Sequence, residues 1–560
     1  MRLALPAVAQ DKTRLAMNLE TAGHLVHEFQ GTQALPGGPH RLDIHPRALS
    51  IPRRLRQGDR RVTVWPSCYL SIHGVVPIDP METQKMTRTF LAVLTTLAFS
   101  GLAWVSFDTS ASELKLHIAP AERLMTEPAH VAVAGAPPGS EVWIEGTFTD
   151  KGGQVWSSRG IYFANHKGFV DTSTSASLAG TYQGVDAEAL FWSMLPVPLD
   201  ELDGASVVNR HEDWPSFPDF DSWNAAYELR KDPVVINFRA ELRGALAGTA
   251  PVATASQSVS FIASGVKRIP VSEGDIRGVL YEAPGGGPHP VAMMVTGSGG
   301  GANEGKAALL ASHGITALAL AHFNYPGRPR MLLNIPLEYF SESMKWLADR
   351  YDKDRVVILG GSRGGEGVLL IASAFPDQVS AVIAEVPANM VFAGCCTEDL
   401  GSGPGWTLNG KPLPYVDWKY SGLTKSAIWA PSHQSREVFR KGITDHDYDD
   451  PRWIPVERIR SPILMITGDA DGLWAAEIAS QRILERLKAK EFAYPAEHIN
   501  YAGASHVVSM PMLVKSLADR MRSQGYGFLS MGGHPRANAH AQTDAFQRTV
   551  MYIKRHGSSG

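Results

Sequence analysis

The sequence predicts an α/β fold, in which a small antiparallel β-sandwich precedes a mostly parallel, doubly wound sheet. Two observations lead to this expectation. Beyond residue 265, short apolar runs alternate with longer segments of helical length, the pattern of a parallel sheet covered by helices. Between 117 and 245, short alternating runs are separated by turn signals such as Pro137-Pro-Gly139, which is typical of antiparallel strands.

Composition fits this assignment and excludes some classes of function. The chain has 560 residues, enough for more than one domain, and its formal net charge of −3 gives no reason to expect a nucleic-acid partner. Its three cysteines, Cys68, Cys395 and Cys396, are too few for a disulfide framework, and the adjacent pair is poorly placed to form a bridge. Buried or idle thiols are therefore expected, with no metal site and no cofactor.

The first part of the chain differs from the rest. Residues 1–80 lack periodicity and are rich in Arg, Pro and Gly, so we expect a disordered extension or sequence upstream of the true start; a polyanion-binding arm is the alternative. Residues 81–111 have the pattern of a signal peptide or membrane anchor, because Lys85 and Arg88 precede an uncharged run over 90–107. This predicts export to a periplasmic or other extracytoplasmic site, or a membrane tether. A buried core helix and a cytoplasmic location are the alternatives.

The remaining chain is expected to form two domains. The sandwich covers 117–245, a polar stretch near 250–268 is the expected boundary, and the α/β-hydrolase-like domain covers 265–556. An irregular insertion over 392–455 is expected to form a cap or substrate-lining loop. The expected strands of the second domain are 278–281, 290–296, 315–321, 356–360, 380–385, 462–467 and 497–501, and its helices lie near 303–312, 336–351, 364–375, 474–488 and 541–555.

The segment Gly360-Gly-Ser-Arg-Gly364 has the layout of a nucleophile elbow, Gly-x-Ser-x-Gly between a strand and a helix. Such a turn strains its central residue, and only small flanking residues fit. Ser362 is the predicted nucleophile. The backbone N–H of Arg363, at the start of the next helix, is a predicted oxyanion donor. Because Gly-rich chains produce this motif by accident, the prediction depends on its context.

A carboxylate and a histidine follow in the chain order Ser, Asp, His of an α/β-hydrolase. His506 lies in a turn after an expected strand and can take and return the serine proton, although an isolated histidine is more often structural. Asp469 and Asp471 compete for the third role. We choose Asp471, because it lies farther past the strand end, and expect Asp469 to hydrogen-bond the turn or cap the next helix.

A glycine-rich loop after an earlier strand, Thr296-Gly-Ser-Gly-Gly-Gly301, is expected to supply the second oxyanion donor, at Ser298. Its glycines allow backbone amides to approach a ligand closely. The same loop could be interpreted as a phosphate cradle, but it lacks the Gly-Lys-Ser/Thr ending of a P-loop.

These motifs together resemble the family of acyl-CoA thioesterases and bile acid-CoA:amino acid N-acyltransferases, over roughly 117–556. The resemblance implies a two-domain enzyme that acts on acyl thioesters such as acyl-CoA, with Ser362, Asp471 and His506 as its triad. Its conjugating members look to use cysteine, so a serine nucleophile resembles the hydrolytic branch. The motifs that carry it are Gly180-Thr-Tyr-Gln-Gly-Val-Asp186, Gly297-Ser-Gly-Gly-Gly301, Ala319-Leu-Ala-His-Phe-Asn-Tyr325, the elbow, Gly468-Asp-Ala-Asp-Gly-Leu-Trp474, Tyr501-Ala-Gly-Ala-Ser-His506 and Gly532-Gly-His-Pro-Arg536.

The leading hypothesis is therefore an acyl-CoA thioesterase that releases free acid and CoA through an acyl-enzyme. An N-acyltransferase or a carboxylester hydrolase on the same fold is the nearest alternative. A membrane-tethered binding protein without catalysis is the alternative from another class. Residues 1–110 and the insertion over 392–455 depart from the family. The resemblance therefore implies the acyl chemistry, but neither the preferred length of the acyl chain nor the cellular compartment.

Overall fold

The computed structural model describes residues 113–149, 155–196, 232–243, 251–395, 403–417, 434–509, 511, 520–523 and 527–557. All of these belong to one compact unit that begins at Ser106. The expected extension over 1–80 and the apolar run over 90–107 lie outside the described residues. Among the residues that are described, no helix is long and apolar enough to cross a membrane.

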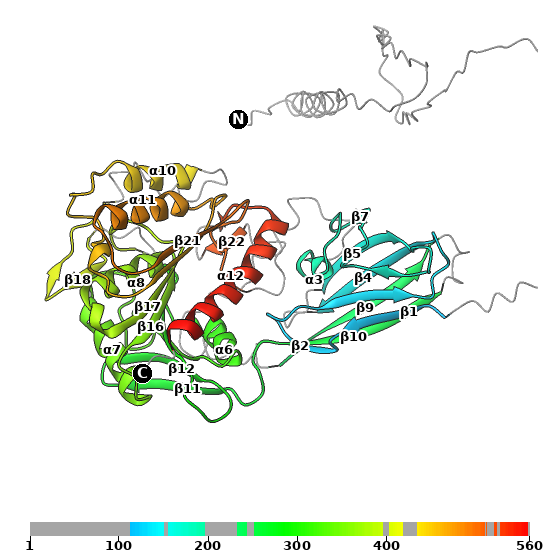
Figure 1. The fold of residues 1–560 in the computed structure, drawn as a ribbon, viewed down its shortest axis with the longest axis horizontal. Helices are drawn as coiled ribbons and strands as arrows, with labels where there is room; N and C mark the ends of the chain where they lie inside the picture. Colours follow the sequence, from blue (N-terminus) through cyan, green and yellow to red (C-terminus); the bar gives the residue numbers. More distant parts are fainter. Residues whose placement is uncertain are drawn as a thin grey trace, which may run out of the picture. The chain divides into compact units, whose positions relative to one another are not determined.

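The N-terminal domain consists of two β-sheets (Figure 1). A three-stranded antiparallel sheet has the order β1-β3-β6, and a seven-stranded sheet has the order β2-β10-β9-β4-β5-β7, with β8 paired to β5. Every pair in the larger sheet is antiparallel except that of β2 with β10. The elements are β1 Lys115–Ala119, β2 Glu122–Leu124, β3 His130–Ala134, β4 Glu141–Thr149, β5 Val155–Phe163, β6 Val170–Asp171, β7 Ala179–Gly180, α3 Ala189–Trp192, β8 Leu195–Pro196, β9 Val234–Leu242 and β10 Val252–Ser260.

Alternation of side chains explains these strands. In β4, Val142, Ile144, Gly146 and Phe148 are buried while the residues between them are partly exposed, the period of two that a half-buried strand requires. The domain extends farther than the sequence indicated, because β10 lies inside the stretch over 250–268 that was expected to be the boundary. Its small, polar residues gave no apolar pattern, yet it pairs with β9 from Val252 to Val259.

The C-terminal domain is built on an eight-stranded sheet of order β11-β12-β14-β13-β16-β17-β20-β21. The first two strands are antiparallel additions, and the other six run parallel. This confirms the expected mostly parallel sheet. The strands are β11 Lys267–Glu273, β12 Ile276–Glu282, β13 Val291–Val295, β14 Thr316–Leu320, β16 Val356–Gly361, β17 Val379–Glu385, β20 Ile463–Gly468 and β21 Ala496–Tyr501.

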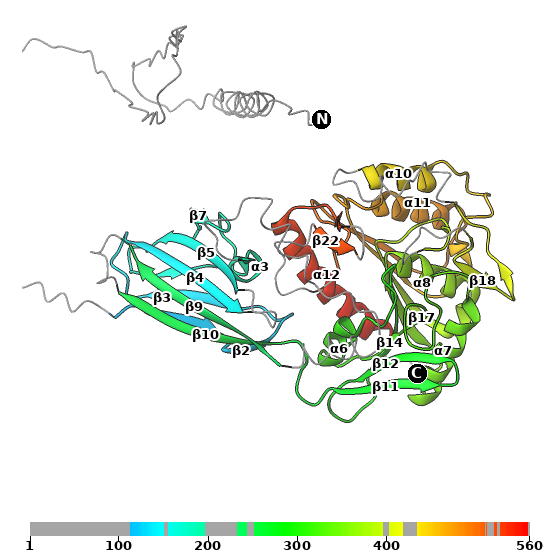
Figure 2. The ribbon, with the colours of Figure 1, turned by 180° about the vertical axis from the view of Figure 1, so that it is seen from behind.

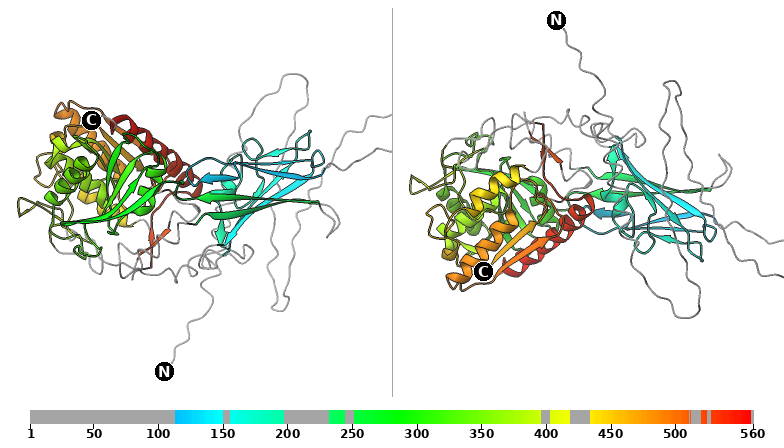
Figure 3. Two further views of the ribbon diagram at one scale, coloured as in Figure 1. Left: turned by 90° about the horizontal axis from the view of Figure 1, so that it is seen from below. Right: turned by 90° about the horizontal axis from the view of Figure 1, so that it is seen from above.

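Helices cover both faces of this sheet: α7 and α8 lie on one side and α6 and α12 on the other (Figures 1 and 2). The views in Figure 3 show α12 running alongside the strands. Because both faces are covered, β13 and β14 are buried along their whole length and appear in the sequence as continuous apolar runs. The helices are α6 Glu304–Ser312, α7 Leu337–Arg350, α8 Arg363–Ala374, α11 Ala476–Ala489 and α12 Pro535–His556, with short 3-10 turns η2 Pro376–Gln378 and η4 Val456–Arg458.

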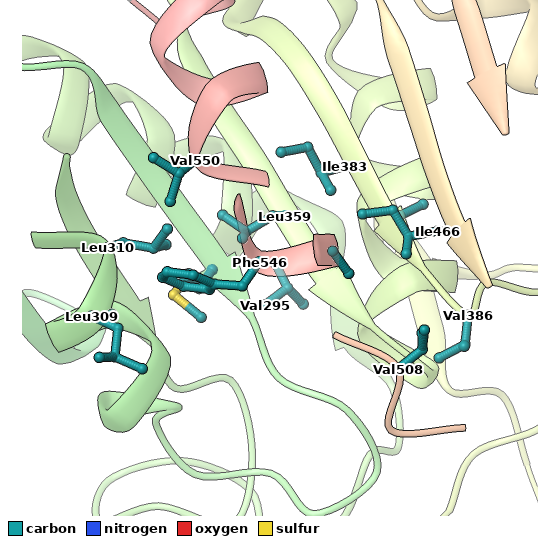
Figure 4. Packing of buried hydrophobic residues seen from close by; sticks show 14 of the residues in the cluster. Val295, Leu309, Leu310, Leu359, Ile383, Val386, Ile466, Val508, Phe546 and Val550 are labelled. Atoms are coloured by element: carbon teal, nitrogen blue, oxygen red, sulfur yellow. The ribbon is translucent and has the colours of Figure 1, made fainter. Parts of the chain in front are cut away.

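The core between the sheet and α12 is shown in Figure 4. Phe546 of α12 lies among Leu309 and Leu310 of α6 and Val295 of β13, and all four are at most 3% exposed. Each fully buried side chain of this size contributes roughly 1.5–3 kcal/mol to folding. This packing fixes α12, whose first turn lies next to the candidate active site.

The insertion over 392–455 is less irregular than the sequence indicated. It contains the helix α10 Gln434–Thr444, which was not predicted from the sequence, and the strands β18 Trp406–Leu408 and β19 Lys411–Pro412. Strand β18 pairs with β15 Ile335–Pro336. A hairpin of β22 Arg520–Ser523 and β23 Gly527–Ser530 follows β21.

The expectation of buried or idle thiols is wrong in part at Cys395, which is buried but disulfide-bonded. The other two cysteines of the chain, Cys68 and Cys396, both lie outside the described residues.

Candidate active site

Ser362 occupies a strained turn between β16 and α8. Its φ of 59° and ψ of −120° lie outside the regions that side-chain-bearing residues favour. The glycines on either side are required by space: a Cβ on Gly360 would lie 2.5 Å from the Gly364 carbonyl oxygen, and a Cβ on Gly364 would lie 2.4 Å from the Val295 carbonyl oxygen. The strain and the small flanks expected of a nucleophile elbow are therefore both present.

A histidine and a carboxylate form a buried pair. His506 Nδ1 lies 2.8 Å from Asp471 Oδ2, and because a carboxylate only accepts hydrogen bonds, Nδ1 donates. Asp471 is fully buried and His506 is 8% exposed. The second carboxylate oxygen of Asp471 accepts the backbone N–H groups of Leu473 and Trp474 at 2.8 and 3.1 Å, which compensates for its loss of water.

The structure separates the two competing aspartates. Asp469 accepts the backbone N–H of Gly503 at 2.7 Å and so holds the turn that precedes His506. Of the two, Asp471 is the one hydrogen-bonded to the imidazole. This arrangement fixes the tautomer of His506, leaving Nε2 as the nitrogen that can accept a proton.

The elbow and the pair lie at the same edge of the sheet. The ends of β16, β17, β20 and β21 are in register, through the partners Gly361 and Glu385, Glu385 and Ile466, and Gly468 and Tyr501. Since these four strands are neighbours and parallel, the segments that follow them meet at one edge, where catalytic groups collect in such sheets.

A short series of contacts links the elbow to the histidine. The Ser362 N–H donates to the Glu385 carbonyl at 2.9 Å, and the carbonyl of the next residue, Val386, accepts the Trp474 indole N–H at 3.0 Å. The ring of Trp474 meets that of His506 edge-on, with centroids 5.9 Å apart. Among the described residues no hydrogen bond joins Ser362 to His506 itself. Such bonds often tighten only when substrate binds.

One backbone carbonyl braces both members of the pair. The Met531 carbonyl accepts the N–H of His506 at 2.9 Å and that of Gly472, the neighbour of Asp471, at 3.0 Å. Asn538 of α12 accepts the Ser505 N–H at 2.8 Å. The turn between them needs glycine at Gly532, where φ is 78° and a Cβ would lie 2.0 Å from a carbonyl oxygen. No role was predicted for these residues from the sequence, where the available signal was the Gly532-Gly533 pair shortly before a proline-initiated helix.

The predicted oxyanion residues border Ser362. A Cβ on Gly297 would lie 3.5 Å from the Ser362 Cβ, so the glycine loop contacts the elbow. Ser298 lies in the turn closed by the Gly300 N–H and the Gly297 carbonyl, at 3.1 Å. Arg363 is the first residue of α8, so its amide belongs to the positive end of the helix dipole.

The Arg363 side chain points into the protein and forms a buried network. Its guanidinium binds the Glu366 carboxylate at 2.5 Å and the Phe392 carbonyl at 3.1 Å, and the Trp406 indole donates to Glu366 at 2.8 Å. Burial lowers the pKa of Arg363 and raises the pKa of Glu366 to about 7, against the opposing effect of the Arg363 charge. The network ties the nucleophile helix to the insertion.

Within the part of the chain that the structure describes, no group of three or more His, Cys, Asp or Glu side chains could hold a metal ion.

Comparisons with known proteins identify the family. A model of the BAAT / acyl-CoA thioester hydrolase C-terminal domain matches residues 335–559, and a model of the acyl-CoA thioester hydrolase/BAAT N-terminal region matches 126–273. Mouse acyl-coenzyme A amino acid N-acyltransferase 1 is 28% identical over 448 residues, 79% of this chain and 98% of that protein. Rat acyl-coenzyme A thioesterase 1 is 28% identical over 461 residues, which are 80% of this chain and 99% of that protein. The family resemblance noted from the motifs is thus confirmed: the chain belongs to the acyl-CoA thioester hydrolase/BAAT family, and carries both its N-terminal region and its C-terminal domain.

Proposed function

We propose that this chain is a serine thioester hydrolase that cleaves acyl-CoA to a free acid and CoA. The observation that carries the proposal is the buried His506–Asp471 pair, joined at 2.8 Å, at the sheet edge that holds the strained Ser362. A serine hydroxyl needs such a base, because it is a weak nucleophile at neutral pH.

The proposed reaction has two steps. His506 Nε2 takes the Ser362 proton as the oxygen attacks the thioester carbonyl, and the tetrahedral intermediate collapses with loss of the CoA sulfur, which receives that proton. Water then attacks the acyl-enzyme with His506 again as base, and the free acid leaves as the proton returns to Ser362. Asp471 stabilises the imidazolium in both steps. The backbone amides of Arg363 and Ser298 are the proposed donors to the oxyanion.

The alternative within the family is transfer of the acyl group to an amino acid. Relatives named for each activity, an N-acyltransferase and a thioesterase, are 28% identical to this chain. The serine nucleophile favours hydrolysis, because an amine attacks the oxygen ester of an acyl-serine less readily than it attacks the thioester of an acyl-cysteine. Release of CoA from a panel of acyl-CoA substrates, with and without glycine or taurine, distinguishes the two. Predominance of the amide product would overturn the hydrolase proposal.

The two aspartates provide a matched pair of variants for this test. We expect Asp471→Asn to lower kcat by about 10³–10⁴-fold, because the imidazole loses its acceptor and its tautomer is no longer fixed. Asp469→Asn alters a carboxylate two residues away that holds only a turn, so it should lower kcat less than about fivefold. Equal losses in the two variants would contradict the assignment of Asp471.

A binding protein without catalysis is the competing proposal from another class. A fluorophosphonate probe should label the wild-type protein at Ser362 and should not label Ser362→Ala. Absence of labelling in folded wild-type protein, together with unchanged ligand binding in Ser362→Ala, would favour the binding protein.

We also propose that residues 90–107 export the protein or tether it to a membrane, on the basis of their uncharged run between basic and acidic flanks. Fractionation of cells that express the full chain, with intact mass measured in each fraction, tests this. Full-length protein confined to the soluble cytoplasmic fraction would overturn it.

A further inference from the structure

A buried ion pair lies beside the elbow. Lys306 of α6 donates a hydrogen bond to the Glu385 carboxylate at the end of β17, and the two side chains are only 5% and 6% exposed. Removing two charges from water is costly, and apolar residues of similar size would often stabilise a fold equally well. Stability alone therefore does not account for a buried ion pair at this position, next to the elbow.

The Glu385 end of the pair contacts the elbow in two ways. Its carbonyl accepts the Ser362 N–H at 2.9 Å. Its carboxylate oxygen Oε2 lies 3.5 Å from the position of a Cβ on Gly361, the residue before the nucleophile. The next residue, Val386, holds the Trp474 indole that packs against His506. Glu385 thus lies between the elbow and the base.

The Lys306 end belongs to the helix that follows the glycine loop. That loop, residues 297–301, contains the predicted oxyanion residue Ser298, and α6 begins shortly after it at Glu304. Gly297 abuts the elbow, since a Cβ there would lie 3.0 Å from the Gly361 carbonyl oxygen. The ion pair therefore joins two segments 79 residues apart that must meet correctly around Ser362.

We propose that Lys306 and Glu385 are positioning residues that hold the glycine loop against the elbow, so that the amides of Ser298 and Arg363 face the same point. This inference rests on the proposed function, because those amides are its oxyanion donors. An oxyanion hole built from two separate loops depends on their spacing, and a displacement of about 1 Å can cost roughly 10²-fold in rate.

The test compares the rates of acyl-CoA hydrolysis and of fluorophosphonate labelling among variants of the pair. We expect Lys306→Met and Glu385→Gln to lower kcat and the labelling rate by about 10–100-fold, with KM changed less than about threefold. Lys306→Arg keeps the charge and the donors and should stay within about fivefold of wild type. Because each single variant leaves one charge buried and is therefore strongly destabilised, the double variant Lys306→Met/Glu385→Leu is decisive. It should fold, yet label at least about tenfold more slowly than wild type. A wild-type labelling rate in the folded double variant overturns the proposal.

A matched control separates positioning from stability. Arg486 of α11 pairs with Glu457 at 2.8 Å, with side chains 9% and 24% exposed, just before the start of β20 and so at the opposite sheet edge from the elbow. Arg486→Met should lower the Tm without slowing labelling, whereas a similar slowing would show that loss of stability alone explains the effect and would overturn positioning.

Hydrogen exchange supplies a readout that does not depend on substrate identity. The amides of residues 297–301 should exchange faster in the double variant than in wild type, while those of α11 stay unchanged. If wild-type protein cleaves no acyl-CoA, the proposed function fails, and this exchange experiment still decides the role of the pair. Unchanged protection at 297–301 would overturn it.

Discussion

Ser362 shows how strictly the neighbours of one residue can be fixed by its backbone. Its φ of 59° is compatible with the turn only because Gly360 and Gly364 bring no side chain into space filled by carbonyl oxygens. The Gly-x-Ser-x-Gly motif therefore predicts the backbone conformation of the turn directly, whereas the catalytic role of Ser362 depends on its neighbours in the fold.

At this position we predict that Gly364→Ala destabilises the protein by about 1–3 kcal/mol and abolishes most activity. The new Cβ would lie 2.4 Å from the Val295 carbonyl oxygen, so either the elbow or β13 must shift. Thermal unfolding and kcat measure the two effects. Gly286→Ala is the control, because no atom lies within 4 Å of a Cβ there; a Gly364→Ala protein with wild-type stability would contradict this account.

The environment of His322 predicts how the stability of the protein changes with pH. It is fully buried against Phe323, Phe340 and Trp406, and neither ring nitrogen has a hydrogen-bond partner among the described residues. Burial, reinforced by the charges of Arg328 and Arg363, lowers its pKa to about 3. The ring is therefore neutral in the folded protein over the physiological range.

The sign of the pH effect follows from this lowered pKa. Below pH 6.5 the unfolded chain binds a proton at His322 that the folded protein does not bind, so the free energy of unfolding falls by about 1.4 kcal/mol per pH unit, or about 2 kcal/mol at pH 5. His322→Phe should remove this contribution and raise the Tm at pH 5 more than at pH 7. His117→Phe, at an exposed histidine, should leave the pH dependence unchanged. An identical pH dependence in His322→Phe and wild type would sink the prediction.

Among the elements, helix α12 both packs in the core and supports the backbone next to His506. Its first turn carries Asn538, which accepts the Ser505 N–H next to His506, while its later turns pack Phe546 and Val550 against the sheet (Figure 4). Because α12 is fixed by its packing in the core, Asn538 holds the backbone at Ser505, next to His506, in a fixed position.

We predict that Asn538→Ala lowers kcat by about tenfold and stability by about 1–3 kcal/mol, because the buried Ser505 N–H loses its acceptor. Gln547→Ala is the matched control on the same helix. It removes a hydrogen bond of 3.0 Å to the Thr126 carbonyl, away from His506, and should lower stability without changing kcat. If both variants changed kcat alike, α12 would not act on His506 through Asn538.

At the scale of the whole molecule, one carboxylate connects the N-terminal sheets to α12. Asp186, whose side chain is 3% exposed, binds His540 at 2.8 Å and Arg536 at 3.2 Å. Burial would raise its pKa, but the His540 hydrogen bond and charge, together with Arg536, hold it below the usual value. This contribution to stability is present above about pH 4 and is lost as the pH falls through the folded-state pKa.

We predict that Asp186→Asn lowers the free energy of unfolding by about 2 kcal/mol at pH 7, and that the difference from wild type shrinks below pH 4. Denaturant unfolding at pH 7 and pH 3 measures it. Asp377→Asn is the control, since that aspartate and its partner Arg460 are 79% and 61% exposed and should contribute little. A difference that stayed constant with pH would exclude the charge of Asp186 as its cause.

Much of the fold could be predicted because the parallel strands are buried on both faces and so appear as uninterrupted apolar runs. Strand β10 could not, since Val252–Ser260 is mostly small and polar. Helix α10 Gln434–Thr444 was missed because it lies within a stretch otherwise rich in Gly, Pro, Trp and Tyr. Local sequence indicated where the candidate catalytic groups lie. It gave no sign of their supports, the Lys306–Glu385 pair and the Asn538 brace, because these contacts join residues 79 and 33 positions apart.

The shared Met531 carbonyl has a consequence for how this site tolerates change. Because it accepts a backbone hydrogen bond on each side of the Asp471–His506 pair, a displacement of that oxygen moves the carboxylate and the imidazole in the same direction. A substitution near Met531 would then alter the distance from the imidazole to the Ser362 hydroxyl while keeping the Asp471–His506 hydrogen bond. Selection or engineering could thus change turnover at this turn without breaking the carboxylate–imidazole pair.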